Sequence, residues 1–253
     1  MSLLSLFGCK DSVICLTFAH PKTKTQAKRM NNLPPVTKNL LIINVLVFMA
    51  AIVTERYGFD LSDLFGLHFF MASDFYLWQP VTYMFLHGGF SHIFFNMFAL
   101  WMFGRIMEQS WGSKRFLIYY LVCGIGAGLT QEVVQYGQYV TELSHYQQVN
   151  IGYATIAMSE YLNMLTTVGA SGAIYGILIG FGLTYPNERM FVFPLPMPIK
   201  AKWFVMGYIV IELVLGLSAG DNVAHFAHLG GMVFGYLLLT YWKKKARGNG
   251  FYR

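Results

Sequence analysis

The sequence predicts an all-α polytopic membrane protein that crosses the bilayer with six helices. Three observations support this fold class: the composition, the length of the apolar runs and the distribution of basic residues between them. Of the 253 residues, 55% are hydrophobic and only 12% are charged, and the mean hydropathy is +0.46. A typical soluble domain carries about 25% charged residues. A soluble domain of this composition would expose large apolar patches, and disorder requires low hydrophobicity, so both classes are excluded.

Six continuous apolar runs have lengths that suit membrane-spanning helices. A span takes roughly 20 residues, and the fourth run is the shortest of the six. Only helices and closed barrels satisfy the backbone polar groups in lipid. Barrel strands would be about 10 residues of strict alternation, so these runs indicate helices. The runs cover residues 39–54, 90–106, 116–134, 171–185, 203–218 and 223–242.

Basic residues alternate between the connections and predict the orientation of the chain. Lys and Arg precede the first run, separate the second from the third and the fourth from the fifth, and follow the sixth. The other connections carry Asp and Glu, with no Lys or Arg beyond Arg56. Because basic loops stay in the cytoplasm, both termini are expected on the cytoplasmic side. The membrane is expected to be the cell (inner) membrane. The same bias explains the net charge of +6 without nucleic acid as a partner.

The runs define one membrane domain with a short tail on each side. Residues 36–245 hold all six runs and form the predicted six-helix domain. Residues 1–35 are expected to be a cytoplasmic tail or a mis-called extension, since Met30 offers an alternative start. Residues 246–253 are expected to be a short basic cytoplasmic tail.

Ser171 is the first candidate functional residue, because polar residues inside membrane spans mark function by default. It lies in the sequence Gly169-Ala170-Ser171-Gly172 at the start of the fourth run. The glycines allow a tight turn, and a helix N-terminus offers free N–H groups and a partial positive charge. A serine in that position is suited to be a nucleophile if a base is nearby.

Depth in the membrane places His228, His92 and Asn96 at the level of Ser171. Ser171 lies 15 residues before Pro186 and His228 lies 15 residues before the basic end of the sixth run. At about 1.5 Å per residue, both lie roughly 22 Å above the inner boundary. The same count puts His92 and Asn96, four apart on one helix face, at roughly 24 and 18 Å. One level therefore holds a nucleophile, a general base and oxyanion donors, as acyl transfer requires.

A Ser–His dyad is expected here rather than a triad. No Asp partners His228, and Glu212 is the one acidic residue of a span at this level; we expect it to be neutralised or hydrogen-bonded. Tyr175, one turn after Ser171, is the candidate for stacking on the His228 ring. His225 and His228 could ligate a metal, but their helix fixes no third ligand, so no metal site is predicted.

Small residues repeat every four positions on the fourth and sixth runs. Such faces let membrane helices approach closely. If the two faces meet, Ser171 and His228 fall within reach of each other. The repeats are Gly172, Gly176 and Gly180, and Ala227, Gly231 and Gly235.

Three motifs occur on or just before the second, fourth and sixth runs. They are Gly169-Ala170-Ser171-Gly172, Ala227-His228-Leu229-Gly230-Gly231, and His87, His92 and Asn96 in the pattern H-x4-H-x3-N. Together they resemble the motifs of the rhomboid intramembrane serine proteases, and the resemblance covers about residues 36–245. It implies a six-helix rhomboid-like bundle without metal or cofactor, which cleaves single-pass transmembrane proteins that enter from the lipid bilayer.

The resemblance also implies a role for each candidate residue. Ser171 would be the nucleophile and His228 the general base. His92, Asn96 and the backbone N–H of Ser171 would line the oxyanion hole. The supporting residues are Gly169 in the active-site turn and Tyr175 against His228.

Two further positions concern the framework of the fold. The resemblance makes Glu108 a structural acidic residue, and it leads us to expect Trp-Arg in the first outer connection, where Gln79 follows Trp78.

A catalytically silent rhomboid-like protein that binds membrane clients is the alternative function, but both Ser171 and His228 are present. A transporter would need more intramembrane charge and usually an internal repeat.

Overall fold

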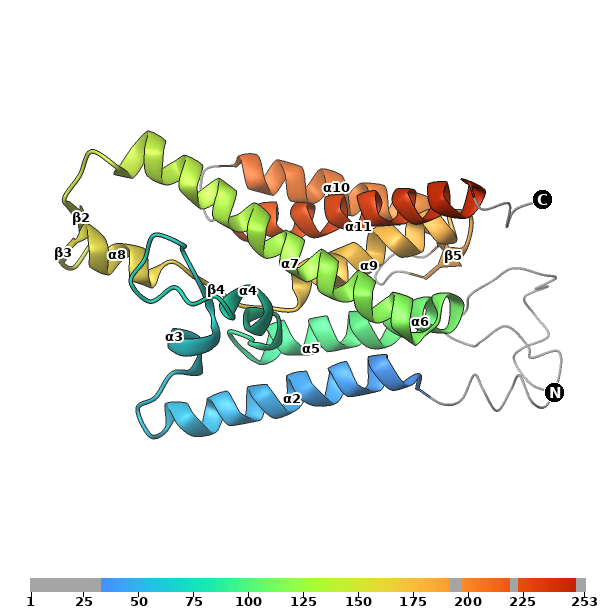
Figure 1. The fold of residues 1–253 in the computed structure, drawn as a ribbon, viewed down its shortest axis with the longest axis horizontal. Helices are drawn as coiled ribbons and strands as arrows, with labels where there is room; N and C mark the ends of the chain where they lie inside the picture. The colour runs from blue at the N-terminus through green and yellow to red at the C-terminus, as the bar shows by residue number, and fades with distance from the viewer. Residues whose placement is uncertain (1–32, 192–196, 219–222, 249–253) are drawn as a thin grey trace.

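Long helices that run roughly side by side make up most of the structure (Figure 1), a computed structural model that describes residues 33–191, 197–218 and 223–248. Every predicted apolar run falls on one of these helices. The helices are α2 (Pro35–Glu55), α5 (Phe90–Ala99) continuing through the π-helix η3 (Leu100–Gly104) into α6 (Arg105–Trp111), α7 (Ser113–Gln138), α9 (Ser171–Thr184), α10 (Ala201–Leu217) and α11 (Val223–Gly248). They begin and end within a few residues of the predicted bounds, but α6 and α11 extend further, to Trp111 and Gly248.

Two segments of the described residues are long and apolar enough to cross a membrane, judged by length and composition alone. They are α2 and the stretch Ser113–Leu143, and α9 is a shorter apolar helix. Large apolar side chains stand exposed along α2, α5 and α10, such as Leu46, Phe95 and Val214. Exposed apolar faces of this size are typical of helices that contact lipid. The count of six membrane passes stays a prediction, and residues 1–32, including the proposed alternative start, lie outside the described residues.

The two long connections at one end of the molecule are joined to each other. The first contains α3 (Leu61–Phe65), β1 (Leu67–His68), α4 (Gln79–Thr82) and η2 (Tyr83–Phe85). The second contains η4 (Tyr139–Leu143), β2 (Gln148–Asn150), β3 (Thr155–Ala157), α8 (Met158–Met164) and β4 (Thr166–Thr167). β2 pairs with β3 as a hairpin, whereas β1 pairs antiparallel with β4 across the two connections. At the other end, β5 (Arg189–Met190) pairs with β6 (Ile199–Lys200).

Gln79 replaces the arginine that the resemblance led us to expect in the first connection. Its side chain is fully buried, and its Oε1 accepts hydrogen bonds from the backbone N–H of Tyr76 (3.1 Å) and of His68 (3.3 Å). Its Nε2 donates to the carbonyl of Asp74 at 2.8 Å. An amide offers both donors and acceptors, so this glutamine organises the loop with neutral hydrogen bonds.

Glu108 on α6 caps the start of α2, where no residue of α2 itself does so. The buried carboxylate accepts from the backbone N–H of Val36 (3.0 Å) and of Thr37 (2.7 Å). The hydroxyls of Thr37 (2.8 Å) and Ser113 (2.6 Å) also donate to it. A negative charge at a helix N-terminus satisfies free N–H groups and interacts favourably with the helix dipole. The structural role expected of Glu108 is thus visible as a link between α6, α2 and α7.

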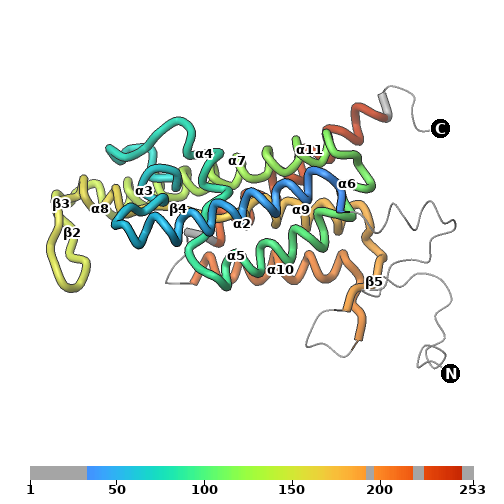
Figure 2. The backbone as a smooth tube through the Cα atoms, turned by 90° about the horizontal axis from the view of Figure 1, so that it is seen from below, coloured from blue at the N-terminus to red at the C-terminus, as the bar shows by residue number. Residues whose placement is uncertain are grey.

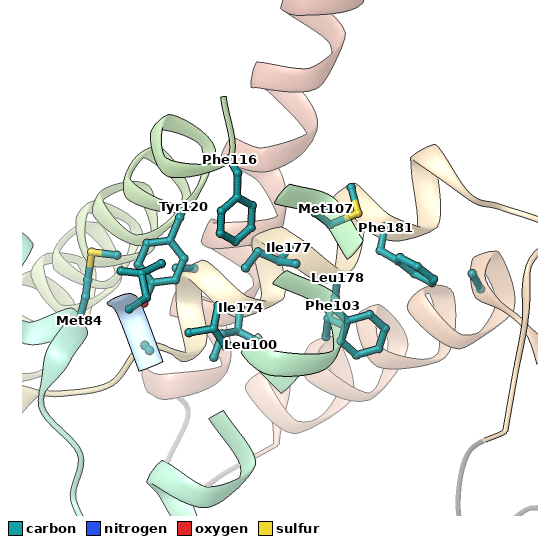
Figure 3. Packing of buried hydrophobic residues seen from close by; sticks show 14 of the residues in the cluster. Met84, Leu100, Phe103, Met107, Phe116, Tyr120, Ile174, Ile177, Leu178 and Phe181 are labelled. Carbon is teal, nitrogen blue, oxygen red and sulfur yellow. The ribbon is translucent and has the colours of Figure 1, made fainter. Parts of the chain in front are cut away.

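α9 lies at the centre of the bundle, between α7, α10 and α11 (Figures 1 and 2). Its large apolar side chains point towards η3, α6 and the start of α7 (Figure 3). Tyr119 on α7 donates from its hydroxyl to the carbonyl of Gly176 at 2.8 Å, which ties the two helices together. The labelled residues of this core are Met84, Leu100, Phe103, Met107, Phe116, Tyr120, Ile174, Ile177, Leu178 and Phe181.

The small-residue faces of α9 and α11 meet along part of their length. A Cβ on Gly231 would overlap the backbone carbonyl of Gly172, so the two helices touch there through their main chains. One turn further along, a Cβ on Gly176 would overlap Cys123 of α7 and would lie 3.1 Å from the carbonyl oxygen of Gly231. Gly235 packs against Tyr119 of α7. The predicted contact between the two faces is therefore confirmed at the ends of α9 and α11 that carry Ser171 and His228. Further along, side chains of α7 pack against both faces.

A single methyl group should test this main-chain contact. We expect Gly231→Ala to lower the thermal unfolding temperature in detergent, because the rigid carbonyl of Gly172 cannot move aside; overpacking typically costs about 1–3 kcal/mol. Gly207→Ala on α10 is the matched control, since a Cβ there meets nothing within 4 Å. The control should be neutral or slightly stabilising. Equal unfolding temperatures for Gly231→Ala and the unmodified protein would contradict the close contact.

Candidate active site

A constrained turn sets the position of Ser171, the first residue of α9. Gly169 has a φ of +135°, which side-chain-bearing residues rarely adopt. A Cβ on Gly169 would also lie 2.8 Å from Nε2 of His92. The N–H of Gly169 donates to the carbonyl of Tyr83 at 2.9 Å, which ties the turn to η2. Only glycine meets these demands, so the turn that presents Ser171 is specified by the sequence.

The structure brings together the two residues that the depth count placed at one level. Nε2 of His228, on α11, lies 2.9 Å from Oγ of Ser171. Ser171 precedes Gly172 and His228 lies three residues before Gly231, so the main-chain contact between α9 and α11 places the pair. Both side chains are partly accessible rather than sealed in the core.

Tyr175 stacks on His228, as its position one turn after Ser171 predicted. The ring centroids are 4.2 Å apart, and the ring planes differ by 11°. The Tyr175 hydroxyl donates to Oε1 of Glu212. The phenol ring therefore restrains one face of the imidazole while its hydroxyl contacts a residue of α10.

Glu212 is an acidic partner of His228, for which the sequence predicted none. Its side chain, with the residue only 4% exposed, places Oε2 3.1 Å from Nδ1 of His228 and 2.7 Å from Nδ1 of His225. With the Tyr175 hydroxyl, the carboxylate thus has three partners from α9 and α11. The expectation that Glu212 is hydrogen-bonded is confirmed, but its contact with His228 departs from an isolated Ser–His pair.

A signal for this contact is present in the sequence. Glu212 lies five residues before the last residue of α10, Leu217, and His228 lies five residues after the first residue of α11, Val223. Two antiparallel helices joined by a short connection place residues at equal distances from the connection side by side. The count from the inner boundary placed Glu212 at the level of the site, and a count from the outer connection would also have paired it with His228.

α5 contributes the residues of the H-x4-H-x3-N pattern. His92 lies against the Gly169 turn, and its ring is 5.1 Å from that of His87. Both ring nitrogens of His87 are buried without a hydrogen-bond partner among the described residues. Burial, and after it the neighbouring His92, lower the pKa of His87 to about 4, so this ring is neutral at physiological pH.

Asn96 lies one turn after His92 on α5 and is 7% exposed. Its Nδ2 is buried and has no hydrogen-bond partner within the part of the chain that the structure describes. A buried donor without a partner costs about 1–3 kcal/mol, so such groups in native proteins call for an explanation. This donor lies one helical turn from His92, which contacts the Gly169 turn.

Glu212, His225 and His228 also offer ligand atoms that lie within 4.8 Å of one another, a spacing that could hold a metal ion. In the structure, the Nδ1 atoms of both histidines are engaged with the same oxygen of Glu212 at hydrogen-bond distance. Hydrogen bonds therefore account for this cluster. The whole arrangement contains the parts that acyl transfer uses: a nucleophile, a base and nearby donors.

Known proteins support the reading of these motifs. A family model described as the Rhomboid domain matches residues 74–245, more than half of the chain. The chain is 30% identical to rhomboid protease AarA of Providencia stuartii over 217 residues, covering 80% of this chain and 70% of that protein. It is 29% identical to rhomboid protease GluP of Bacillus subtilis, covering 63% of this chain and 25% of that protein.

It is also 26% identical to rhomboid protease GlpG of Yersinia pseudotuberculosis over 213 residues, covering 82% of this chain and 62% of that protein. The chain therefore spans most of AarA, but a smaller share of GlpG and only a quarter of GluP. The match of more than half of the chain to the Rhomboid model agrees with the three sequence motifs. This chain belongs to the rhomboid family.

Proposed function

We propose that this chain is an intramembrane serine protease that hydrolyses peptide bonds in or near transmembrane segments of membrane proteins. The observation that carries the proposal is the 2.9 Å approach of Ser171 Oγ to His228 Nε2. The relatives named as rhomboid proteases support the same activity. The nucleophile is Ser171 and the general base is His228.

The reaction proceeds by acyl transfer. The Ser171 hydroxyl gives its proton to Nε2 of His228 as Oγ attacks the carbonyl carbon of the scissile bond. The tetrahedral intermediate collapses when Nε2 returns that proton to the leaving amine, and an ester to Ser171 remains. Water then attacks the ester with His228 again accepting the proton, which releases the carboxylic acid and restores the serine.

The oxyanion of the tetrahedral intermediate is stabilised by donors from two helices. Ser171 is the first residue of α9, so its backbone N–H has no partner within the helix and lies at the positive end of the dipole. His92 lies against the same turn, and Asn96 carries a buried amide donor without a partner among the described residues. Donors fixed in advance at a developing charge are the strongest single source of rate enhancement in many enzymes.

The substrates are single-pass transmembrane proteins that reach the site from the lipid bilayer. In Figure 1, α2 begins and α11 ends at the end of the molecule opposite to β2, β3 and α8. This arrangement agrees with six passes and with both termini in the cytoplasm, as the distribution of basic residues indicates. Cleavage would then occur near the outer end of the substrate helix, in the cell (inner) membrane.

Replacement of either reacting residue should abolish cleavage. In detergent with a model transmembrane substrate, we expect Ser171→Ala and His228→Ala to lower the cleavage rate by more than about 1,000-fold, because nucleophile and base act as a unit. Gel analysis of substrate and product measures the rate. The exposed Ser144→Ala is the matched control and should cleave normally. Unchanged cleavage by Ser171→Ala would refute the proposal, and substrate binding without cleavage by the unmodified protein would favour the client-binding alternative.

The oxyanion role of Asn96 predicts a loss of rate with little change in affinity. We expect Asn96→Ala to lower kcat about 100- to 1,000-fold, because the lost donor acts on the charge formed in the transition state. KM should change only a few-fold, and the variant should remain folded, since Nδ2 makes no hydrogen bond to the part of the chain that the structure describes. Exposed Asn150→Ala is the control. A raised KM with normal kcat would assign Asn96 to substrate binding instead.

A further inference from the structure

We infer that Glu212 is a positioning residue that holds the imidazole of His228 in the tautomer able to accept the Ser171 proton. Glu212, His228 and Ser171 would then form a hydrogen-bonded row across α10, α11 and α9. The inference rests on the proposed protease function, which itself requires only Ser171 and His228.

Both nitrogens of the His228 ring have a partner, and the chemistry of the partners fixes the proton. Nδ1 lies 3.1 Å from Oε2 of Glu212, and Nε2 lies 2.9 Å from Oγ of Ser171. An ionised carboxylate only accepts hydrogen bonds, so the single N–H of a neutral imidazole must be on Nδ1. Nε2 then presents a lone pair to the Ser171 hydroxyl. Without Glu212, the proton would be free to occupy Nε2, and in that tautomer Nε2 has no lone pair to accept the Ser171 proton.

The carboxylate is held independently of His228. The hydroxyl of Tyr175 donates to Oε1, and Nδ1 of His225 lies 2.7 Å from Oε2. A buried carboxylate is costly unless it is hydrogen-bonded, and bonds to an ionised group are roughly twice as strong as neutral ones. These two contacts offset that cost and aim the remaining acceptor capacity of Oε2 at His228.

The stacked ring of Tyr175 also restrains the orientation of the His228 imidazole. Tyr175 covers one face of the His228 imidazole, with the ring centroids 4.2 Å apart, and opposes rotation about the Cβ–Cγ bond, whereas the hydrogen bond to Glu212 holds Nδ1 in place. Tyr175 contacts both the imidazole and the carboxylate, so the three side chains lock one another. A base held in this way loses less entropy when it reacts.

Glu212 also acts on the charge that the reaction creates. When Ser171 Oγ attacks the substrate, its proton moves to Nε2 and His228 becomes an imidazolium with protons on both nitrogens. The negative carboxylate beside Nδ1 stabilises this cation, and the proton on Nδ1 stays on the ring. Nε2 then delivers its proton to the leaving amine, which returns the imidazole to its neutral form.

Cleavage kinetics of three variants test the inference. We expect Glu212→Gln, which keeps the shape but removes the charge, to lower kcat about 100- to 10,000-fold, while KM changes only a few-fold. Glu212→Asp should recover part of this loss, because it restores a carboxylate on a shorter side chain. The matched control is Glu132→Gln on α7, a glutamate that accepts from the backbone N–H of Phe70 and should retain normal kcat. Normal kcat in Glu212→Gln would overturn the inference.

¹⁵N NMR of histidine-labelled protein in detergent tests the tautomer without using activity. The His228 signals are assigned by their loss in His228→Ala. In the unmodified protein we expect a protonated Nδ1 and an unprotonated Nε2, and in Glu212→Gln a shift of the proton towards Nε2. A protonated Nε2 in the unmodified protein would overturn the inference, whether or not the protein cleaves. If the protein has the expected tautomer but does not cleave, the proposed function fails and the positioning by Glu212 stands.

A chelator separates hydrogen bonding from metal binding by Glu212, His225 and His228. We expect EDTA to leave both the cleavage rate and the His228 ¹⁵N shifts unchanged. A loss of cleavage that Zn²⁺ restores would show that the carboxylate and the two histidines hold a metal ion, and it would overturn the positioning role.

Discussion

The main-chain contact between α9 and α11 is the constraint on which the site depends. Where the carbonyl of Gly172 meets Gly231, no side chain separates the two helices. Ser171 and His228 lie within one turn of this contact, so their side chains reach each other across a gap of 2.9 Å. A methyl group at the contact would widen that gap, and a hydrogen bond does not tolerate such a change.

The two buried carboxylates illustrate a second constraint, which follows from the apolar composition. Few charges occur inside the bundle, and each of these carboxylates is surrounded by donors: Glu108 by groups of α2 and α7, and Glu212 by groups of α9 and α11. Because little water is available there, a charge must find its hydrogen bonds within the protein. Glu108 uses them to fix a helix end. Glu212 uses them beside the proposed general base, where a fixed negative charge has a chemical effect.

The sequence predicted the helices and most of the candidate site, but not the contacts within the connections. Continuous apolar runs end where charged and turn residues begin, so the bounds of α9 and α10 agree within two residues. A count of residues along parallel-running spans was enough to bring Ser171 and His228 together. The pairing of β1 with β4 joins short segments about 100 residues apart that carry no periodic signal. The partners of Gln79 are mostly backbone groups, which no residue pattern reveals. The count from the inner boundary placed Glu212 at the level of the site but did not pair it with His228.

Covalent labelling of the nucleophile tests the central claim most directly. A fluorophosphonate reacts with an activated serine without requiring a membrane substrate, and peptide mass spectrometry locates the adduct. We predict a single adduct on Ser171, formed rapidly in the unmodified protein and very slowly in His228→Ala. An adduct on another serine, or equal labelling of Ser171 in the presence and absence of the His228 side chain, would contradict the account.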